Sequence, residues 1–544
     1  MRTRRAASGT AGAAEDGRPA PESPQRAEEL RVEHRGGPPP GGRDGEGAAG
    51  GRTRLQGAGL LLGPLLAVLV HVTLPPSPAL TPEARVTAAL AVLIAVWWMT
   101  EALPLAATAL VPIVAFPLAG VVELDTATAA YGDPTVFLFL GGFAIALAMQ
   151  RWGLHQRIAL GTVRVVGTRP TRLVLGVMIA TAFLSMWVSN TATTLLMVPI
   201  GVSVLALVDR RTSGTLPEHE VQRFGAGLVL AIAYAATIGG LATLVGSPPN
   251  LILAGVAEST LGIEIGFAAW MAVGVPVSVV MLVIAWLLLT KVQYRPRIGE
   301  IAGGRQAISE ELHALGRMSP GEWTVAAVFA STALLWVFRA PLSDWEALTE
   351  AVPLVTRLSD GGIAIAALLA LFLVPVRGQR GRGALDWSTL QKGVPWGVLL
   401  LFGGGLSMAA AIQESGLDTY IGERFSGLDA LPLVLLVAAV ALGILALTEL
   451  TSNTATAATF LPVLAAVAVG IGAEPLLLLV PAALAATCSF MMPVGTPPNA
   501  IAYGTGRVTI GQMVRSGVWL NLIAVVVLTA AVFAIGPLVF GFSL

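Results

Sequence analysis

The sequence predicts an all-α protein that crosses a membrane many times, with about eleven transmembrane helices plus two re-entrant hairpins in an inverted repeat. Three observations predict this fold: a composition poor in charge, a succession of long apolar runs, and two motifs that each recur at a fixed offset. Of the 544 residues, 55% are hydrophobic and 12% are charged, against about 25% charged in typical soluble domains. Most of the chain is therefore expected to lie in lipid.

The N-terminal segment, residues 1–56, differs from the rest. It holds ten arginines and eight acidic residues among many glycines, prolines and alanines. Such a segment has too little apolar surface to fold, so we expect a disordered cytoplasmic tail. The first apolar run begins near Leu60 and continues as a full span, which favours a membrane helix over a secretory signal.

Thirteen apolar segments follow, each long enough to cross or re-enter a bilayer. They lie near 58–75, 83–99, 104–122, 134–152, 173–208, 224–257 and 266–290, and near 321–338, 359–376, 394–413, 430–471, 474–504 and 515–540. A polar stretch, 291–320, separates the two series. We interpret it as a cytoplasmic linker between a first membrane half, 57–290, and a second, 321–544.

The loops between these segments alternate between basic and acidic. Because Lys and Arg gather in cytoplasmic loops, this alternation places the N terminus in the cytoplasm and predicts a multi-pass plasma-membrane protein. The alternation holds only if 173–208 and 430–471 each enter and leave on one side, the first from the cytoplasm and the second from outside. We therefore interpret both as re-entrant hairpins, which require a covering of protein or a water-filled cavity.

Two motifs recur between the halves. Ser-Asn-Thr-Ala-Thr at 189–193 returns at 452–456, an offset of 263. Gly-Ser-Pro-Pro-Asn at 246–250 returns as Gly-Thr-Pro-Pro-Asn at 495–499, an offset of 249. One hairpin enters from each side, so the halves are expected to be inverted, an arrangement that commonly places a substrate site at the midplane.

The residue types in these motifs suit ion binding. Ser, Thr and Asn side chains donate and accept hydrogen bonds, and a hairpin tip exposes backbone carbonyls beside the N–H groups of the next helix. Oxygen ligands suit a hard cation such as sodium, whereas helix N-termini suit an anion. The Pro-Pro pairs must unwind their spans. Single motifs of this kind are often helix-to-helix contacts, but their duplication in register favours two cation pockets flanking one anion pocket.

Few titratable groups lie inside the predicted spans, chiefly His71, Glu101 and Glu449. Intramembrane carboxylates are functional candidates, and Glu449 directly precedes the second Ser-Asn-Thr motif. We favour a structural role for it, holding the hairpin rather than carrying protons, and structural roles for the other two. A chain of acids that could relay protons is not seen, so a cation other than H⁺ is expected.

The two Ser-Asn-Thr motifs, their Pro-Pro-Asn companions and the stretch Thr-Glu-Ala-Leu-Pro-Leu at 100–105 resemble the divalent anion/sodium symporter family. This family comprises sodium-coupled dicarboxylate, citrate and sulfate transporters, and the resemblance covers residues 57–544. It implies a homodimer in which each protomer has a scaffold subdomain and a transport subdomain that moves like an elevator. The tail has no counterpart in the family pattern.

The resemblance also assigns candidate site residues. A first Na⁺ site would use Ser185, Ser189, Asn190 and the Gly246 carbonyl, and a second would use Thr448, Thr451, Asn453 and the Gly495 carbonyl. The substrate carboxylates would be bound by Asn190, Thr191, Ser247, Asn453, Thr454 and Thr496. Family members can carry alanine at the positions of Thr451 and Gly495, so contacts there are expected through the main chain.

The resulting prediction is a secondary transporter that imports a C4 dicarboxylate, such as succinate, malate or fumarate, with Na⁺ as the coupling ion. A sodium-independent dicarboxylate exchanger and a sulfate or citrate transporter of the same fold stay open as alternatives. An anion channel would need a continuous pore, against which the hairpins argue. No nucleophile, metal cluster or paired acids lie at membrane depth to suggest an enzyme, and a formal net charge of zero offers no surface for nucleic acid.

Overall fold

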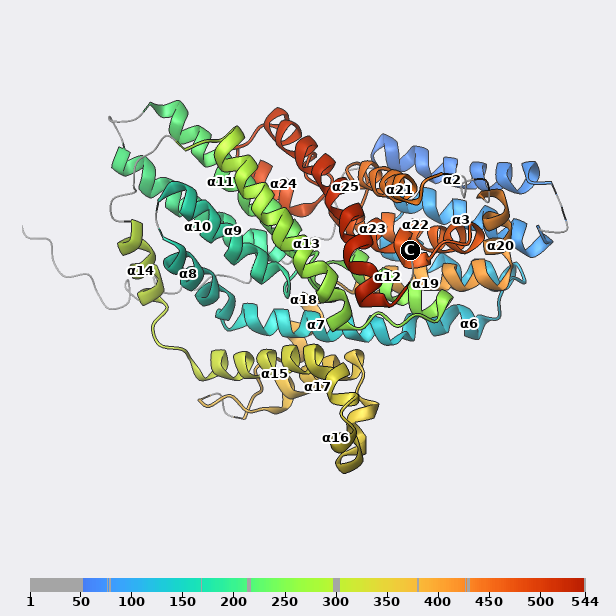
Figure 1. The fold of residues 1–544 in the computed structure, drawn as a ribbon, viewed down its shortest axis with the longest axis horizontal. Helices are drawn as coiled ribbons and strands as arrows, with labels where there is room; N and C mark the ends of the chain where they lie inside the picture. Colours follow the sequence, from blue (N-terminus) through green and yellow to red (C-terminus); the bar gives the residue numbers. More distant parts are fainter. Residues whose placement is uncertain are drawn as a thin grey trace, which may run out of the picture. The chain divides into compact units, whose positions relative to one another are not determined.

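The computed structural model describes residues 52–75, 77, 80–167, 169–212, 217–296, 304–378, 381–425, 427 and 431–542. Apart from two isolated bridges, all regular structure in these ranges is helical (Figure 1). Most of the predicted tail lies outside them. The predicted end of the tail at residue 56 was wrong, because its last three residues belong to the first helix, which begins at Arg54. Thr53 and Gln56 form a reciprocal capping box at the start of this helix.

The first half of the chain forms twelve α-helices among the described residues. They are α2 (Arg54–Thr73), α3 (Pro82–Thr100), α4 (Leu105–Thr108), α5 (Val111–Leu118), α6 (Leu124–Ala129), α7 (Pro134–Arg151), α8 (Leu154–Val166), α9 (Pro170–Ser185), α10 (Asn190–Thr212), α11 (Glu218–Gly239), α12 (Pro248–Leu261) and α13 (Phe267–Leu287). A π-helical turn, Leu288–Gln293, extends α13. The predicted linker is partly helical, since α14 (Gly304–Ala314) lies within it.

The second half repeats much of this order. Its helices are α15 (Pro320–Ser343), α16 (Glu346–Ala351), α17 (Asp360–Leu373), α18 (Trp387–Gly393), α19 (Trp396–Glu414), α20 (Leu417–Phe425), α21 (Leu433–Thr448), α22 (Asn453–Gly470), α23 (Pro475–Thr487), α24 (Pro497–Gly504) and α25 (Ile510–Phe540). Nine helical segments in the described ranges are long and apolar enough to cross a membrane. The prediction of an all-α, multi-pass fold is confirmed.

Both predicted hairpins consist of two helices joined by a short break. The first break, 186–189, separates α9 from α10, and the second, 449–452, separates α21 from α22. In each, a serine just before the second arm accepts a hydrogen bond from a first-turn N–H, as Ser189 does from Ala192 and Ser452 from Ala455. This capping explains why the helix restarts there.

The two Pro-Pro motifs interrupt their spans as expected. The backbone leaves the helix between α11 and α12, residues 240–247, and between α23 and α24, residues 488–496. We call these segments the first and second unwound loops. Proline supplies no N–H and disfavours helix in the residue before it, so each new helix begins at the first proline.

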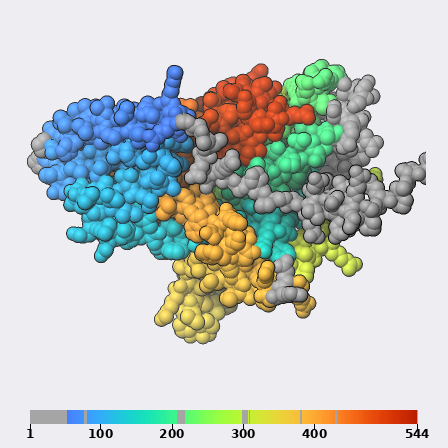
Figure 2. All heavy atoms as spheres, turned by 180° about the vertical axis from the view of Figure 1, so that it is seen from behind, coloured from blue at the N-terminus to red at the C-terminus, as the bar shows by residue number. Residues whose placement is uncertain are grey.

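The helices pack in two groups. A frame consists of α2–α7 and α15–α19, and a central bundle consists of α9–α13 and α21–α25. Helices α8 and α20 connect them, each after a glycine with positive φ, Gly153 and Gly416. Figure 2 shows the blue and cyan frame helices on one side of the molecule's face and the red C-terminal helices beside them. Helices α11 and α23 are almost entirely buried. Helix α11 packs against both arms of the first hairpin, and α23 packs against both arms of the second.

Candidate functional site

The first candidate cation site is assembled around the end of α11. The hydroxyl of Ser185, which is fully buried, donates to Oδ1 of Asn190 across the hairpin break at 2.6 Å. Asn190 lies against Gly240, where an added Cβ would come within 2.6 Å of the same oxygen. The hairpin tip therefore touches the first unwound loop, and only glycine leaves room for the contact.

The first unwound loop is held closed by Asn250, the last residue of the first Pro-Pro-Asn motif. Its side-chain nitrogen donates to the carbonyls of Gly240 and Thr243, at 2.9 and 2.8 Å. A Cβ at Gly246 would lie 2.7 Å from the Gly240 carbonyl oxygen, so the loop can close only over a glycine. The loop brings Gly246 close to the residues that contact Asn190.

The second unwound loop is held in the same way. Asn499 donates to the carbonyls of Ser489 and Met492, at 3.2 and 3.1 Å. These two acceptors lie 249 residues after Gly240 and Thr243, the offset of the Pro-Pro-Asn motif. Sequence reasoning identified both asparagines as part of a motif but gave them no role. The two halves share this local arrangement, while their inversion across the membrane stays a prediction.

The second candidate cation site includes Thr448 and Asn453. Thr448 donates its hydroxyl to the carbonyl of Ala486 at 2.7 Å, so its oxygen can accept from Asn453, 2.6 Å away. With the amide nitrogen of Asn453 on that side, it also donates to the Gly495 carbonyl at 3.1 Å. The structure thus brings the predicted Thr448, Asn453 and Gly495 together.

Thr451 and the predicted substrate ligands lie around these two clusters. The Thr451 hydroxyl is engaged inside its own hairpin, 2.8 Å from both the Leu447 carbonyl and Thr456 Oγ1. Thr191 and Thr454 are the second residues of α10 and α22 and are half-buried. Their hydroxyls make no hydrogen bond within the described part of the chain.

Ser247 and Thr496 occupy equivalent positions directly before the two Pro-Pro pairs, and both side chains are buried. The Ser247 hydroxyl lies 3.0 Å from that of Thr487, at the end of α23. This contact joins the first unwound loop to the start of the second. The two clusters of predicted ligands therefore belong to one connected region of the central bundle.

Glu449 lies in the second hairpin break and is 5% exposed. Its carboxylate accepts hydrogen bonds from five groups: the backbone N–H of Phe490, Met491 and Met492, the hydroxyl of Ser489 and the side-chain nitrogen of Asn521. A structural role was predicted for Glu449. These partners were not, because they lie 40 to 72 residues away in sequence.

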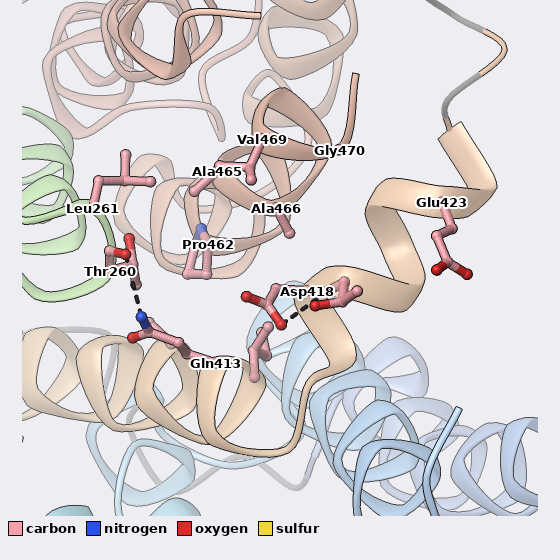
Figure 3. A pocket seen from close by; sticks show the side chains of 13 residues that line it. Thr260, Leu261, Gln413, Asp418, Glu423, Pro462, Ala465, Ala466, Val469 and Gly470 are labelled. Atoms are coloured by element: carbon pink, nitrogen blue, oxygen red, sulfur yellow. Dashed lines mark hydrogen bonds between the residues drawn. The ribbon is translucent and has the colours of Figure 1, made fainter. Parts of the chain in front are cut away.

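A large cavity lies apart from all of these residues. Its volume is about 700 Å³, and it is bounded by the ends of α12, α19, α20 and α22 (Figure 3). Asp418 and Glu423 project from α20 on one side, opposite Pro462 and Val469 of α22. None of the predicted ligands lines it. The cavity is lined by helices of the central bundle, α12 and α22, together with α19 of the frame and the connecting helix α20.

The chain is similar to known families and proteins. A family model described as "Sodium:sulfate symporter transmembrane region" matches residues 59–541. The chain is 43% identical over 488 residues to the sodium-dependent dicarboxylate transporter SdcS of Staphylococcus aureus, in strains RF122 and USA300 alike. The match covers 89% of this chain and 92% of SdcS.

Two solved structures share the fold at low sequence identity. The YdaH transporter of Alcanivorax borkumensis aligns with a TM-score of 0.51 and 14% identity, over 77% of this chain and 88% of its own. MtrF of Neisseria gonorrhoeae aligns with a TM-score of 0.55 and 12% identity, over 87% of this chain and 98% of its own. At such identity the likeness concerns the fold alone.

Proposed function

We propose a specific transport reaction for this chain, which belongs to the sodium:sulfate symporter family. The family membership and the assignment as a multi-pass membrane transporter rather than an enzyme were both predicted from the sequence and are confirmed. The reaction we propose is the Na⁺-coupled symport of C4 dicarboxylates such as succinate, malate and fumarate. The similarity to a sodium-dependent dicarboxylate transporter supports both the ion and the substrate class.

The chemistry of the two clusters supports binding of Na⁺. Ser185, Ser189, Asn190 and the Gly246 carbonyl would hold one ion, and Thr448, Asn453 and the carbonyls of Thr451 and Gly495 would hold another. Their hydroxyl and carbonyl oxygens are neutral, the ligand type that hard cations prefer. To join them at the second site, Asn453 would turn its side-chain oxygen toward the ion, in place of the nitrogen that contacts Thr448 and Gly495. The observation that carries the proposal is that each hairpin places an asparagine amide 2.6 Å from a hydroxyl of its first arm, Asn190 beside Ser185 and Asn453 beside Thr448.

The substrate would lie between the two hairpin tips. The first turns of α10 and α22 present N–H groups and the positive ends of their helix dipoles, which favour an anion. Asn190, Thr191, Ser247, Asn453, Thr454 and Thr496 would bind its carboxylates. Because these groups are uncharged, the Na⁺ ions would balance much of the substrate's charge, which couples the binding of cation and anion.

The frame and the central bundle suit an elevator mechanism. In this proposal the central bundle carries substrate and ions across the membrane while the frame stays fixed, and two frames form a homodimer. The cavity of about 700 Å³ is lined by residues of both groups, α19 of the frame and α12 and α22 of the central bundle, together with α20. The N terminus would lie in the cytoplasm, as the basic loops predict.

Uptake of labelled succinate into proteoliposomes under an inward Na⁺ gradient tests the proposal. We expect uptake that depends on Na⁺ and stops when the gradient is abolished. Equal uptake with potassium or choline in place of Na⁺ would overturn the coupling. Counterflow from vesicles preloaded with unlabelled succinate separates symport from sodium-independent exchange.

Sulfate is a second candidate substrate, because the matching family model is named for sodium:sulfate symporters. Sulfate and a dicarboxylate differ in the spacing of their charges, so a site built for two separated carboxylates should discriminate between them. We expect unlabelled sulfate at millimolar concentration to compete weakly with succinate. Competition by sulfate that is stronger than competition by malate or fumarate would favour the sulfate alternative. Unlabelled citrate is tested in the same way, and stronger competition by citrate would favour the citrate alternative.

A further inference from the structure

Glu449 stands out because its charge is buried among neutral partners. The carboxylate accepts from three consecutive backbone N–H groups, at 2.8 Å from Phe490, 3.0 and 3.2 Å from Met491 and 2.9 Å from Met492. Ser489 Oγ and Asn521 Nδ2 add contacts of 3.1 and 2.7 Å. Consecutive N–H groups around one anion form a nest, and every partner here is a donor, as a carboxylate requires.

The second unwound loop needs this anion. Because residues 490–492 are not in a helix, their N–H groups have no helical carbonyl to bind. Phe490 is also fully buried, so water cannot replace the missing carbonyl there. A buried backbone donor without a partner is costly. Glu449 satisfies the N–H groups of residues 490–492, while Asn499 satisfies the carbonyls of Ser489 and Met492. Two side chains therefore fix the loop in one conformation.

The fixed loop carries a predicted cation ligand. Gly495 lies against the backbone of Glu449, since an added Cβ would be 3.1 Å from the Glu449 carbonyl oxygen and 3.3 Å from its Cα. The Gly495 carbonyl faces Asn453 at 3.1 Å. A shift of the loop would move this carbonyl away from the hairpin tip that supplies the other ligands.

We propose that Glu449 is a positioning residue for the second cation site. Its carboxylate holds the second unwound loop so that the Gly495 carbonyl meets Asn453, and it thereby sets how strongly the protein responds to Na⁺. The inference rests on the proposed function, because it takes that site to bind Na⁺. Glu449 does not contact the ion in this proposal; it acts through the loop.

The first half of the chain has no carboxylate at the position equivalent to Glu449, and this position supplies a matched control. The residue 263 positions before Glu449 is Met186. Its carbonyl, rather than its side chain, is used there, accepting a hydrogen bond from the Thr243 hydroxyl. Met186→Leu keeps that carbonyl and the apolar side chain, so we expect it to leave the Na⁺ response unchanged.

The test compares Glu449→Gln, Glu449→Asp and Met186→Leu in purified full-length protein. Two measurements are made: the Na⁺ concentration that gives half-maximal succinate uptake, and the shift in melting temperature caused by Na⁺ alone. We expect Glu449→Gln to need about tenfold more Na⁺ for half-maximal uptake and for the same melting shift. The glutamine amide nitrogen is a donor, so it would face the donating N–H groups of Met491 and Met492. Glu449→Asp keeps the carboxylate and should recover part of the response, whereas a purely structural loss would lower maximal uptake without moving the Na⁺ dependence.

A double variant separates the contact of Glu449 with the backbone N–H groups of residues 490–492 from its contact with Asn521 of α25. Glu449→Gln combined with Asn521→Asp restores a carboxylate–amide pair between these two positions but leaves the loop N–H groups without an anion. We expect this variant to stay as defective as Glu449→Gln. Restoration of the wild-type Na⁺ dependence would overturn the inference, and so would a Na⁺ dependence within twofold of wild type in Glu449→Gln.

The two readouts distinguish the inference from the proposed function. If wild-type protein is stabilised by Na⁺ but transports no dicarboxylate, the proposed substrate is wrong and the Glu449 variants are judged on the melting shift alone. If Glu449→Gln does not fold, Glu449→Asp decides: a Na⁺ dependence raised at least about threefold supports the inference, and an unchanged one contradicts it.

Discussion

The two unwound loops have the same backbone plan but are fastened differently. In both, an asparagine donates to two loop carbonyls: Asn250 in the first and Asn499 in the second. The first loop is attached to its hairpin by the Thr243 hydroxyl, which donates to the Met186 carbonyl. The second is attached by the carboxylate of Glu449, which accepts from three loop N–H groups. The asparagine contacts are common to both loops, whereas the contact that attaches each loop to its hairpin differs.

The two hairpin tips also differ in what lies behind them. Trp187, in the first break, stacks on Phe267 at 6.0 Å and meets Phe329 edge-on at 5.0 Å, and Phe267 stacks on Trp336 at 4.4 Å. Phe329 and Trp336 belong to α15 of the frame, so the first tip is held partly by apolar contact with the frame. The second tip is held by polar contacts inside the central bundle, through Asn521 of α25.

The largest expected effect tests whether both halves are equally necessary. Asn190→Ala and Asn453→Ala should each abolish sodium-driven succinate uptake, because each removes the side chain that links a hairpin tip to its unwound loop. Both variants should still elute as folded protein, since both positions are only half-buried. Wild-type uptake by both would defeat the site assignment, and loss in only one would show that the halves contribute unequally.

The next prediction tests the shared fastening. Asn250→Ala and Asn499→Ala each leave two loop carbonyls without their donor, which should cost about 3 kcal/mol of stability. The two losses should be nearly equal, because the contacts are equivalent. Thermal unfolding in detergent measures both. A clear difference between them would break the equivalence of the two loops.

A somewhat smaller effect is expected from the aromatic contact behind the first tip. Trp187→Leu removes two ring contacts and should destabilise the protein by about 2 kcal/mol. Trp323→Leu is the control, since this tryptophan on α15 is 62% exposed and should change the melting temperature little. Equal behaviour of the two variants would argue that the ring contacts do not hold the tip.

The hydrogen bond between Thr243 and the Met186 carbonyl, which attaches the first loop, should contribute less to stability. Thr243→Val removes the hydroxyl that donates to the Met186 carbonyl and accepts from the Gly246 N–H at 3.1 Å. We expect a loss of about 1.5 kcal/mol, whereas Thr243→Ser keeps the hydroxyl and should be close to wild type. If Thr243→Val shifts the melting temperature more than Glu449→Gln, the contrast between the two fastenings is wrong.

The smallest effect concerns the frame, away from both loops. The backbone N–H of Thr389, followed by its hydroxyl and Arg151, holds the pKa of Asp386 below its usual value of 3.8, while burial opposes the shift. A lowered carboxyl pKa stabilises the fold above pH 3.8 and loses that contribution as the pH falls through the lowered value. Because Asp386 is nearly half exposed, Asp386→Asn should cost below about 1 kcal/mol at pH 7. Melting curves at pH 7 and pH 3 check it, and a larger gap between variant and wild type at pH 3 would contradict it.

The sequence determined the helices, their breaks and the duplicated motifs. Apolar runs locate the spans because lipid demands them, and Pro-Pro pairs must end a helix wherever they occur. The pairs Ser185 with Asn190 and Thr448 with Asn453 were also within reach, because both members lie on one hairpin, five residues apart.

Only the tertiary structure decided how these pieces are held. The partners of Glu449, the carbonyls bound by Asn250 and Asn499, and the rings around Trp187 come from helices distant in sequence, and no local pattern encodes which ones meet. Position 449 illustrates the limit: the repeat aligns Glu449 with Met186, and the sequence alone says only that they differ. Packing of α23 and α25 against the second hairpin brings five donors to that carboxylate, because a buried charge is stable only where neighbouring elements supply its hydrogen bonds.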